Sequence, residues 1–163
     1  MILVCAASNG NNLANAKTIG EQAEQHGIEH QILDLASLEW PLYSPLSENR
    51  GAPPNFSAVH DLFQNASAFV FCSPEYNGSI PPVLSNAIAW LSVSSDDFRV
   101  LFNGKPAALS TQSGGHGQKV LMAMRVQLSH LGCIVVGRDL VSFPDKPLRE
   151  DSIKAVLFQL TSR

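Results

Sequence analysis

A short polar segment near the middle of the chain combines an aromatic ring, a carboxylate, an amide and a glycine. Residues 74–78 read Pro-Glu-Tyr-Asn-Gly and are separated by Ser73 alone from the apolar run of residues 68–72. Proline and glycine let the main chain approach a flat ligand closely, and N–H groups there can stabilise negative charge that develops during a reaction. Because Asn-Gly is also a strong turn signal, an ordinary turn before a helix is the alternative interpretation. The candidate binding residues are Pro74, Glu75, Tyr76, Asn77 and Gly78.

A second polar segment, residues 8–12, has the composition of a phosphate-binding loop. It reads Ser-Asn-Gly-Asn-Asn and connects the apolar start of the chain to a helical pattern. The N–H groups of such a turn, together with the positive end of the helix dipole, can bind a phosphate dianion without a lysine. Neither a Walker loop nor a G-x-G-x-x-G fingerprint is present, and an ordinary polar turn with Asn12 as the helix N-cap is the alternative interpretation. The candidate binding residues are Ser8, Asn11, Asn12 and Leu13.

A third segment, residues 110–117, is rich in serine and glycine. Three glycines among its eight residues permit close approach of the main chain to a ligand, again just before a helical pattern. A capping or solvated role is more common for a histidine in this setting than acid catalysis, so His116 is not assigned a catalytic role. The candidate binding residues are Ser113, Gly114 and Gly115.

Strand and helix patterns alternate along the whole chain and position these three segments. Residues 36–55, with four prolines and few periodic apolar positions, read as a long loop. Gly27 is expected to terminate the first helix, and Pro81 or Pro82 to open the helix after the central polar segment. Strands are predicted at residues 1–7, 29–33, 68–72, 106–110 and 133–136, the last reaching 143 in its longest form. Helices are predicted at residues 12–26, 56–64, 82–91, 116–131 and about 153–160.

Five strands alternating with helices predict a doubly wound parallel α/β sheet covered by helices on both faces. With this number of strands we expect the strand order 2-1-3-4-5, whose switch point lies between the first and third strands. The two most polar segments follow these two strands. A length of 163 residues fits a single domain over residues 1–163.

The central segment and the helix after it identify a family resemblance. Residues 74–90 read PEYNGSIPPVLSNAIAW and resemble the PEYNGSIPG-x-LKNA-x-DW segment of the NADPH-dependent FMN reductase family, departing from it at Pro82 and Ala89. The first loop is similar to the family's Gly-Ser-x-Arg-x-x-Ser-x-Asn loop, but it is shorter and lacks the arginine.

The resemblance implies a flavodoxin-like fold with FMN bound across the three segments. It also implies hydride transfer from NADPH or NADH to FMN and then to a small-molecule electron acceptor: free flavin, a quinone, an azo compound or chromate. This chemistry needs an exposed ring more than catalytic side chains, so no catalytic residue is assigned. A homodimer or homotetramer is expected in this family. A flavodoxin-type electron carrier and a cofactor-free binding protein of the same fold are the alternatives.

Composition excludes several other classes of protein. The net charge is −3 without a cluster of Lys or Arg, so nucleic acid is not an expected partner. Apolar runs are too short for a membrane span, and the first seven residues read as a strand rather than a signal peptide, which predicts a cytoplasmic protein. The three cysteines, which fall in or beside apolar runs, are expected to be buried thiols, and no metal site is predicted: Cys5, Cys72 and Cys133.

Overall fold

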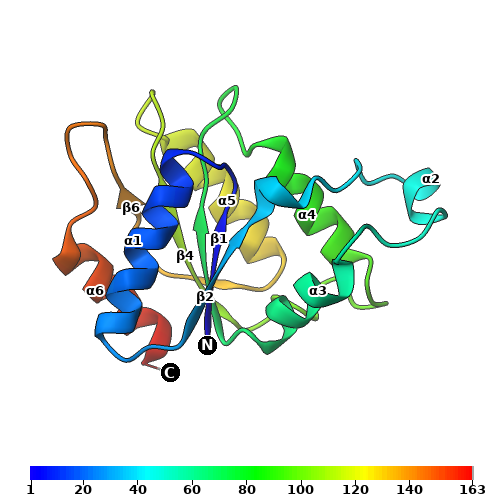
Figure 1. The fold of residues 1–163 in the computed structure, drawn as a ribbon, viewed down its shortest axis with the longest axis horizontal. Coiled ribbons are helices and arrows are strands. Elements are labelled where there is room, and N and C mark those ends of the chain that lie inside the picture. Colours follow the sequence, from blue (N-terminus) through cyan, green and yellow to red (C-terminus); the bar gives the residue numbers. More distant parts are fainter. Residues whose placement is uncertain (163) are drawn as a thin grey trace.

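In the computed structural model, which describes residues 1–162, a parallel sheet lies between two layers of helices (Figure 1). The strands pair in the order β2-β1-β3-β4-β5, and a sixth short strand, β6, also pairs with β4. The predicted fold class and strand order are therefore confirmed. The strands are β1 (Ile2–Ala6), β2 (His30–Asp34), β3 (Ala68–Cys72), β4 (Pro106–Thr111), β5 (Ile134–Val135) and β6 (Leu140–Val141).

The fifth strand of the prediction is divided in two. β5 pairs with the start of β4 and β6 with its end, both parallel to it. Arg125 holds the intervening segment, because its guanidinium donates to the Val136 carbonyl at 2.9 Å and to the Asp139 carboxylate at 2.6 Å. Burial raises the pKa of the Asp139 carboxyl, and the Arg125 charge opposes that rise. Sequence periodicity did not reveal this interruption.

Helices α1 and α6 pack on one face of the sheet, and α3, α4 and α5 pack on the other (Figure 1). Alternate side chains of the central strands enter the two cores; Leu3 and Cys5 of β1 face one, and Val4 and Ala6 face the other. In the described part of the chain, none of the helices has the length and apolar character that crossing a bilayer requires. The main helices are α1 (Asn11–Gln25), α3 (Phe56–Asn65), α4 (Pro82–Ser92), α5 (Gln118–His130) and α6 (Glu150–Thr161).

Glycines set two helix boundaries. Gly27, with φ +67°, lies just beyond α1, and its N–H donates to the Glu24 carbonyl at 2.9 Å, which completes the terminating turn as expected. At α5 the predicted start is wrong by two residues. His116 and Gly117 have φ values of +68° and +69°, outside the helical range, so the helix begins at Gln118.

The predicted loop of residues 36–55 is more ordered than its composition suggested. It begins within a 3₁₀ turn, η1 (Leu35–Leu38), and contains a short helix, α2 (Pro45–Glu48). Its first part is bound to α4: Asn86 donates to the carbonyls of Trp40 and Pro41 and accepts from the Tyr43 N–H at 2.7 Å. Beyond Tyr43 the segment projects from the body of the protein (Figure 1).

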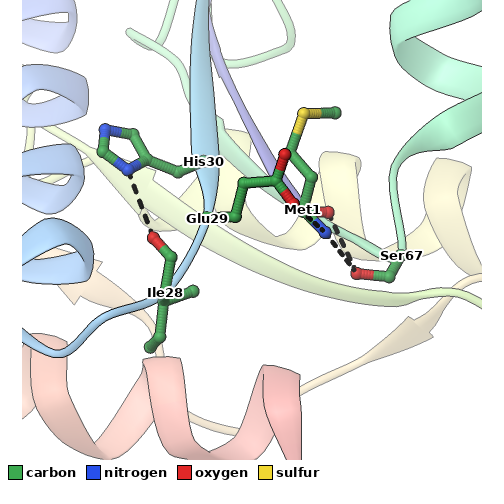
Figure 2. Close-up of polar contacts among 5 residues, drawn as sticks. All are labelled: Met1, Ile28, Glu29, His30 and Ser67. Atoms are coloured by element: carbon green, nitrogen blue, oxygen red, sulfur yellow. Dashed lines mark hydrogen bonds and ion pairs between the residues drawn. The ribbon is translucent and has the colours of Figure 1, made fainter.

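The amino end of the sheet is fastened by local polar contacts (Figure 2). The Ser67 hydroxyl donates to the Met1 carbonyl at 2.9 Å, and the Met1 amino group lies 3.8 Å from the Glu29 carboxylate. These contacts join the starts of β1, β2 and β3. The three polar segments lie at the opposite, carboxyl end of the strands.

Candidate functional site

The three candidate loops emerge side by side from adjacent strands at the top of Figure 1. The sheet ladder continues one residue past the strands, since the Ala7 N–H donates to the Cys72 carbonyl at 2.8 Å and the Ser73 N–H to the Ser110 carbonyl at 2.9 Å. The first loop follows β1, the second follows β3 and the third follows β4. The fold thus brings the predicted segments to one edge of the sheet, as parallel strand order requires.

No side chain of the first loop accepts a hydrogen bond from the N–H groups at the amino end of α1. The N-cap is Gly10, which has no side chain to accept a hydrogen bond, and the first turn contains no acidic residue. The first main-chain bond of the helix runs from Ala14 N–H to Gly10 C=O, so the N–H groups of residues 11–13 have no acceptor within the helix. An anion placed here would meet these donors and the positive end of the dipole.

Asn12 has a structural role that the sequence did not indicate. It is not the N-cap, so that alternative is wrong; its side chain is buried, at 2% exposure, inside the first turn. Its carboxamide donates to the Gln112 carbonyl at 3.1 Å and accepts from the Gln112 N–H at 2.9 Å. The side chain is therefore occupied in joining the first loop to the third, and its main-chain N–H is the group left for a ligand.

The second loop is a tight hairpin. The N–H and C=O of Tyr76 pair with those of Ser79 at 3.1 and 3.0 Å. Asn77 and Gly78, with φ values of +50° and +74°, form the two-residue turn that Asn-Gly predicts. The Tyr76 side chain is half exposed at the hairpin, with 52% of its surface accessible.

Glu75 ties the second loop to the third. Its N–H donates to the Ser113 hydroxyl at 2.7 Å. Its carboxylate accepts from the N–H of Lys119 at 3.2 Å and, more weakly, from that of Val120 at 3.4 Å, both in the first turn of α5. The carboxylate therefore caps that helix, which is a structural role and not acid–base chemistry.

The glycines of the third loop lie beside these contacts. A Cβ atom built on Gly114 would meet no atom within 4 Å, and one on Gly115 would lie 4.0 Å from the Glu75 carboxylate. The Ser113 hydroxyl lies 3.0 Å from that of Thr111 at the end of β4, which fixes the start of the loop to the sheet. The main chain at both glycines is open to close approach.

A cleft of about 350 Å³ opens between the first and second loops. This volume falls within the range of small-molecule sites, about 300–1,000 Å³. The predicted residues Ser8 and Tyr76 line it, and residues 113–115 of the third loop do not. Its lining residues are Ala7, Ser8, Asn9, Ala36, Tyr76, Pro81, Pro82 and Val83.

Several residues of this edge were missed by sequence reasoning. Gln112 is the main-chain partner of Asn12, and nothing in the local pattern marked the pair. The hydroxyl of Ser142, just after β6, accepts from the Asn15 carboxamide at 2.9 Å and has the Gln112 side-chain oxygen as an acceptor at 3.1 Å. The cap of α5 by Glu75 also had no local signal, because Gly117 at the N-cap position contributes no side-chain acceptor and Glu75 lies more than 40 positions away in the chain.

The cysteines are buried free thiols, as predicted. Cys72 ends β3 directly below the second loop. Burial raises the pKa of its thiol to about 12, with a smaller opposing effect from a hydrogen bond with Ser110. Burial likewise raises the pKa of Cys5 and brings that of Cys133 to about 12.

Comparison with known proteins identifies the family. The sequence model of the NADPH-dependent FMN reductase family matches residues 1–147. The chain belongs to this family. The resemblance stated from residues 74–90 and the first loop is confirmed, although the arginine of that loop is absent.

Similar proteins carry the names of reductases. An NAD(P)H-dependent FMN reductase of Pseudomonas aeruginosa is 35% identical over 89 residues, which cover 55% of this chain and 45% of that protein. A probable NADPH:quinone oxidoreductase of Oryza sativa is 34% identical over 114 residues, covering 69% of this chain and 54% of that protein. The chain spans about half the length of the curated relatives it matches.

Solved structures share the fold. The flavoenzyme NAD(P)H:(acceptor) oxidoreductase FerB of Paracoccus denitrificans has a TM-score of 0.73 at 21% identity, covering 99% of this chain and 93% of its own. A flavodoxin from the domain Archaea has a TM-score of 0.64 at 16% identity, covering 96% of this chain and 91% of its own. These likenesses support the flavodoxin-like architecture alone.

Proposed function

We propose that this protein is an FMN-dependent oxidoreductase that takes a hydride from NADPH or NADH and passes electrons to a small-molecule acceptor. When bound, FMN would supply the hydride and electron chemistry. Family membership supports this proposal, and the observation that carries it is the open amino end of α1 beside the cleft. The protein's own part is to bind, orient and partly expose the ring.

The first loop fits a phosphate monoester. The N–H groups of Asn11, Asn12 and Leu13 have no acceptor within α1, and Ser8 borders the adjoining cleft. Because main-chain donors and the helix dipole bind the anion, the missing arginine does not remove the site. We assign the phosphate to these residues.

The second and third loops fit the ring. Main-chain groups of Pro74 to Gly78 would approach one part of it, and the open glycines next to Ser113 would approach its pyrimidine edge. Tyr76, half exposed and lining the cleft, would limit access to the ring. No side chain is needed as a general acid or base, and the Glu75 carboxylate is already occupied by α5.

A second groove favours flat, apolar acceptors. It has a volume of about 250 Å³ and shares Pro82 and Val83 with the cleft. The charged residue in its lining is Glu39, a carboxylate, which would repel chromate. We therefore propose a quinone or another flat aromatic compound as the preferred acceptor. The remaining lining residues are Leu35, Leu38, Trp40, Leu42, Asn86 and Ala87.

Flavin binding and turnover test the proposal directly. The purified protein, incubated with FMN and desalted, is expected to keep a flavin absorbance that bleaches on anaerobic addition of NADPH or NADH and returns on addition of a quinone. Flavin that stays bound but is reduced only by a partner reductase would favour an electron carrier. Failure to retain any flavin would contradict both functions. Rates with a quinone and with chromate, compared at equal concentration, test the choice of acceptor.

Assembly remains a prediction of the family resemblance, and location a prediction of the sequence pattern. We propose a homodimer or homotetramer; Leu46 on the projecting segment, 72% exposed, is compatible with burial against another copy. Sedimentation of the FMN-loaded protein measures this. A cytoplasmic location agrees with buried free thiols, which persist in reducing compartments.

A further inference from the structure

Glu75 is held by both its main chain and its side chain at the junction of two loops. Its N–H donates to the Ser113 hydroxyl at 2.7 Å, and its carboxylate accepts from the first turn of α5, most closely from Lys119 N–H at 3.2 Å. The helix has 13 residues, and its N-cap, Gly117, contributes no side-chain acceptor. The second loop therefore supplies the cap of the helix that follows the third loop.

This arrangement fixes the relative position of the two loops. The Ser113 hydroxyl is also within 3.0 Å of the Thr111 hydroxyl, so the contact is anchored to the end of β4. On the other side, the side chain of Lys119 packs over the hairpin turn, with its Cδ 3.3 Å from the place where a Gly78 Cβ would stand. Loss of the Glu75 side chain would remove the contact between the second loop and the first turn of α5, while the hydrogen bonds of the sheet stay intact.

The same carboxylate places a fixed negative charge between the loops assigned to the flavin ring. Reduced flavin carries more negative charge than oxidised flavin, so a nearby carboxylate disfavours reduction. The carboxylate accepts from N–H groups at the positive, amino end of α5, without any ligand bound.

We propose that Glu75 is a positioning residue with two effects: it locks the second loop to the third, and its charge lowers the reduction potential of bound FMN. The second effect rests on the proposed function, and the first does not. Neither effect requires Glu75 to exchange a proton with substrate.

Hydrogen exchange of the cofactor-free protein tests the lock. In Glu75→Ala, the amides of Lys119 and Val120 lose their acceptor, and residues 113–118 lose the side-chain tie of α5 to the second loop. Amides of residues 113–120 are therefore expected to exchange at least ten-fold faster than in the wild type, while amides of β1 and β3 keep their rates. Ser113→Ala, which removes the main-chain contact but keeps the cap, is expected to give a smaller increase confined to the loops. Glu150→Gln, at the exposed start of α6, is the matched control and should change none of these rates.

The potential of the FMN-loaded protein tests the charge. Glu75→Gln keeps an oxygen acceptor for α5 but removes the charge, so the cap geometry is preserved. We expect reduced FMN to gain about ten-fold in affinity relative to oxidised FMN, which corresponds to a two-electron potential raised by about 30 mV. Glu150→Gln should leave the potential at the wild-type value.

The two halves can fail separately. Exchange at residues 113–120 that is the same in Glu75→Ala as in the Glu150→Gln control would overturn the lock. A Glu75→Gln potential equal to that of the wild type would overturn the charge effect. If Glu75→Ala does not fold, Ser113→Ala with unchanged loop exchange overturns the lock instead. A wild type that binds no FMN would refute the proposed function and the charge effect, and the exchange measurement would still decide the lock.

Discussion

The amino ends of α1 and α5 lie at the same edge of the sheet, and they satisfy their unpaired N–H groups in different ways. Both helices have a glycine N-cap without a side-chain acceptor, Gly10 in one and Gly117 in the other. At α5, Glu75 supplies the missing acceptor from the second loop. At α1, the first turn contains neither an acid nor a cap. One positive helix end is thus neutralised internally, and the other is left open.

This difference assigns separate tasks to two loops that look alike in sequence. Both are small, polar and rich in glycine or asparagine, and each precedes a helix. The open end of α1 is suited to an external dianion, whereas a second anion at α5 would face the Glu75 carboxylate. The third loop is therefore suited to contact a ring through its main chain at Gly114 and Gly115.

The contact between Asn12 and Gln112 joins the first turn of α1 to the loop that precedes α5. Of the changes at these two helix ends, breaking this contact should have the largest effect. Asn12→Leu removes both hydrogen bonds and leaves the partly buried N–H and C=O of Gln112 without these partners. We expect the free energy of unfolding to fall by about 3 kcal/mol. Urea denaturation of the cofactor-free protein measures it, with Asn11→Ala at the exposed neighbouring position as the control. A loss below about 1 kcal/mol would show that the contact does not join the loops.

The sequence was sufficient to predict the order of the main helices and strands, because apolar runs and helical periodicity are local signals. The strand order 2-1-3-4-5 then followed from the doubly wound topology. It also placed the hairpin at Asn77 and Gly78, whose turn type depends on two adjacent residues. The partners of Asn12 and Glu75 could not be predicted, since each contact joins residues far apart in the chain. The interruption between β5 and β6 depends in the same way on a distant residue, Arg125.

A carboxylate added to the uncapped amino end of α1 directly tests whether the two helix ends differ. In Asn11→Asp, the new charge in the first turn of α1 should stabilise the cofactor-free protein by about 0.5 kcal/mol through the dipole. The same charge should repel a phosphate, weakening FMN binding by about 2 kcal/mol, or about 30-fold. A gain in stability of the cofactor-free protein together with a loss of FMN affinity would indicate that this helix end binds an external anion. Thermal unfolding and fluorescence titration with FMN measure the two quantities.

The matched control places the same change at the other helix. Gln118 is the first residue of α5 and is exposed. Gln118→Glu therefore adds a carboxylate to a helix end that the Glu75 carboxylate already caps. We expect a change in FMN affinity of less than about three-fold, since this end is assigned no phosphate. Equal losses of affinity in the two variants would remove the distinction between the helix ends. The loss in Asn11→Asp should also shrink as salt is raised.

The smallest effect is expected at Cys72. If Glu75 alone supplies the negative charge near the amino end of α5, the Cys72 thiol must be neutral. This thiol ends β3 close to Glu75, and a thiolate there would add a second negative charge below the loops. Burial raises the pKa of Cys72 to about 12, so at pH 8 only on the order of one thiol in ten thousand is ionised. Because thiolate is the reactive form, the native protein should not react with a thiol reagent such as Ellman's reagent at pH 8, whereas all three cysteines should react in urea. Rapid native labelling that Cys72→Ala abolishes would reveal a thiolate beside Glu75, and the difference between the two helix ends could then no longer be attributed to the Glu75 carboxylate alone.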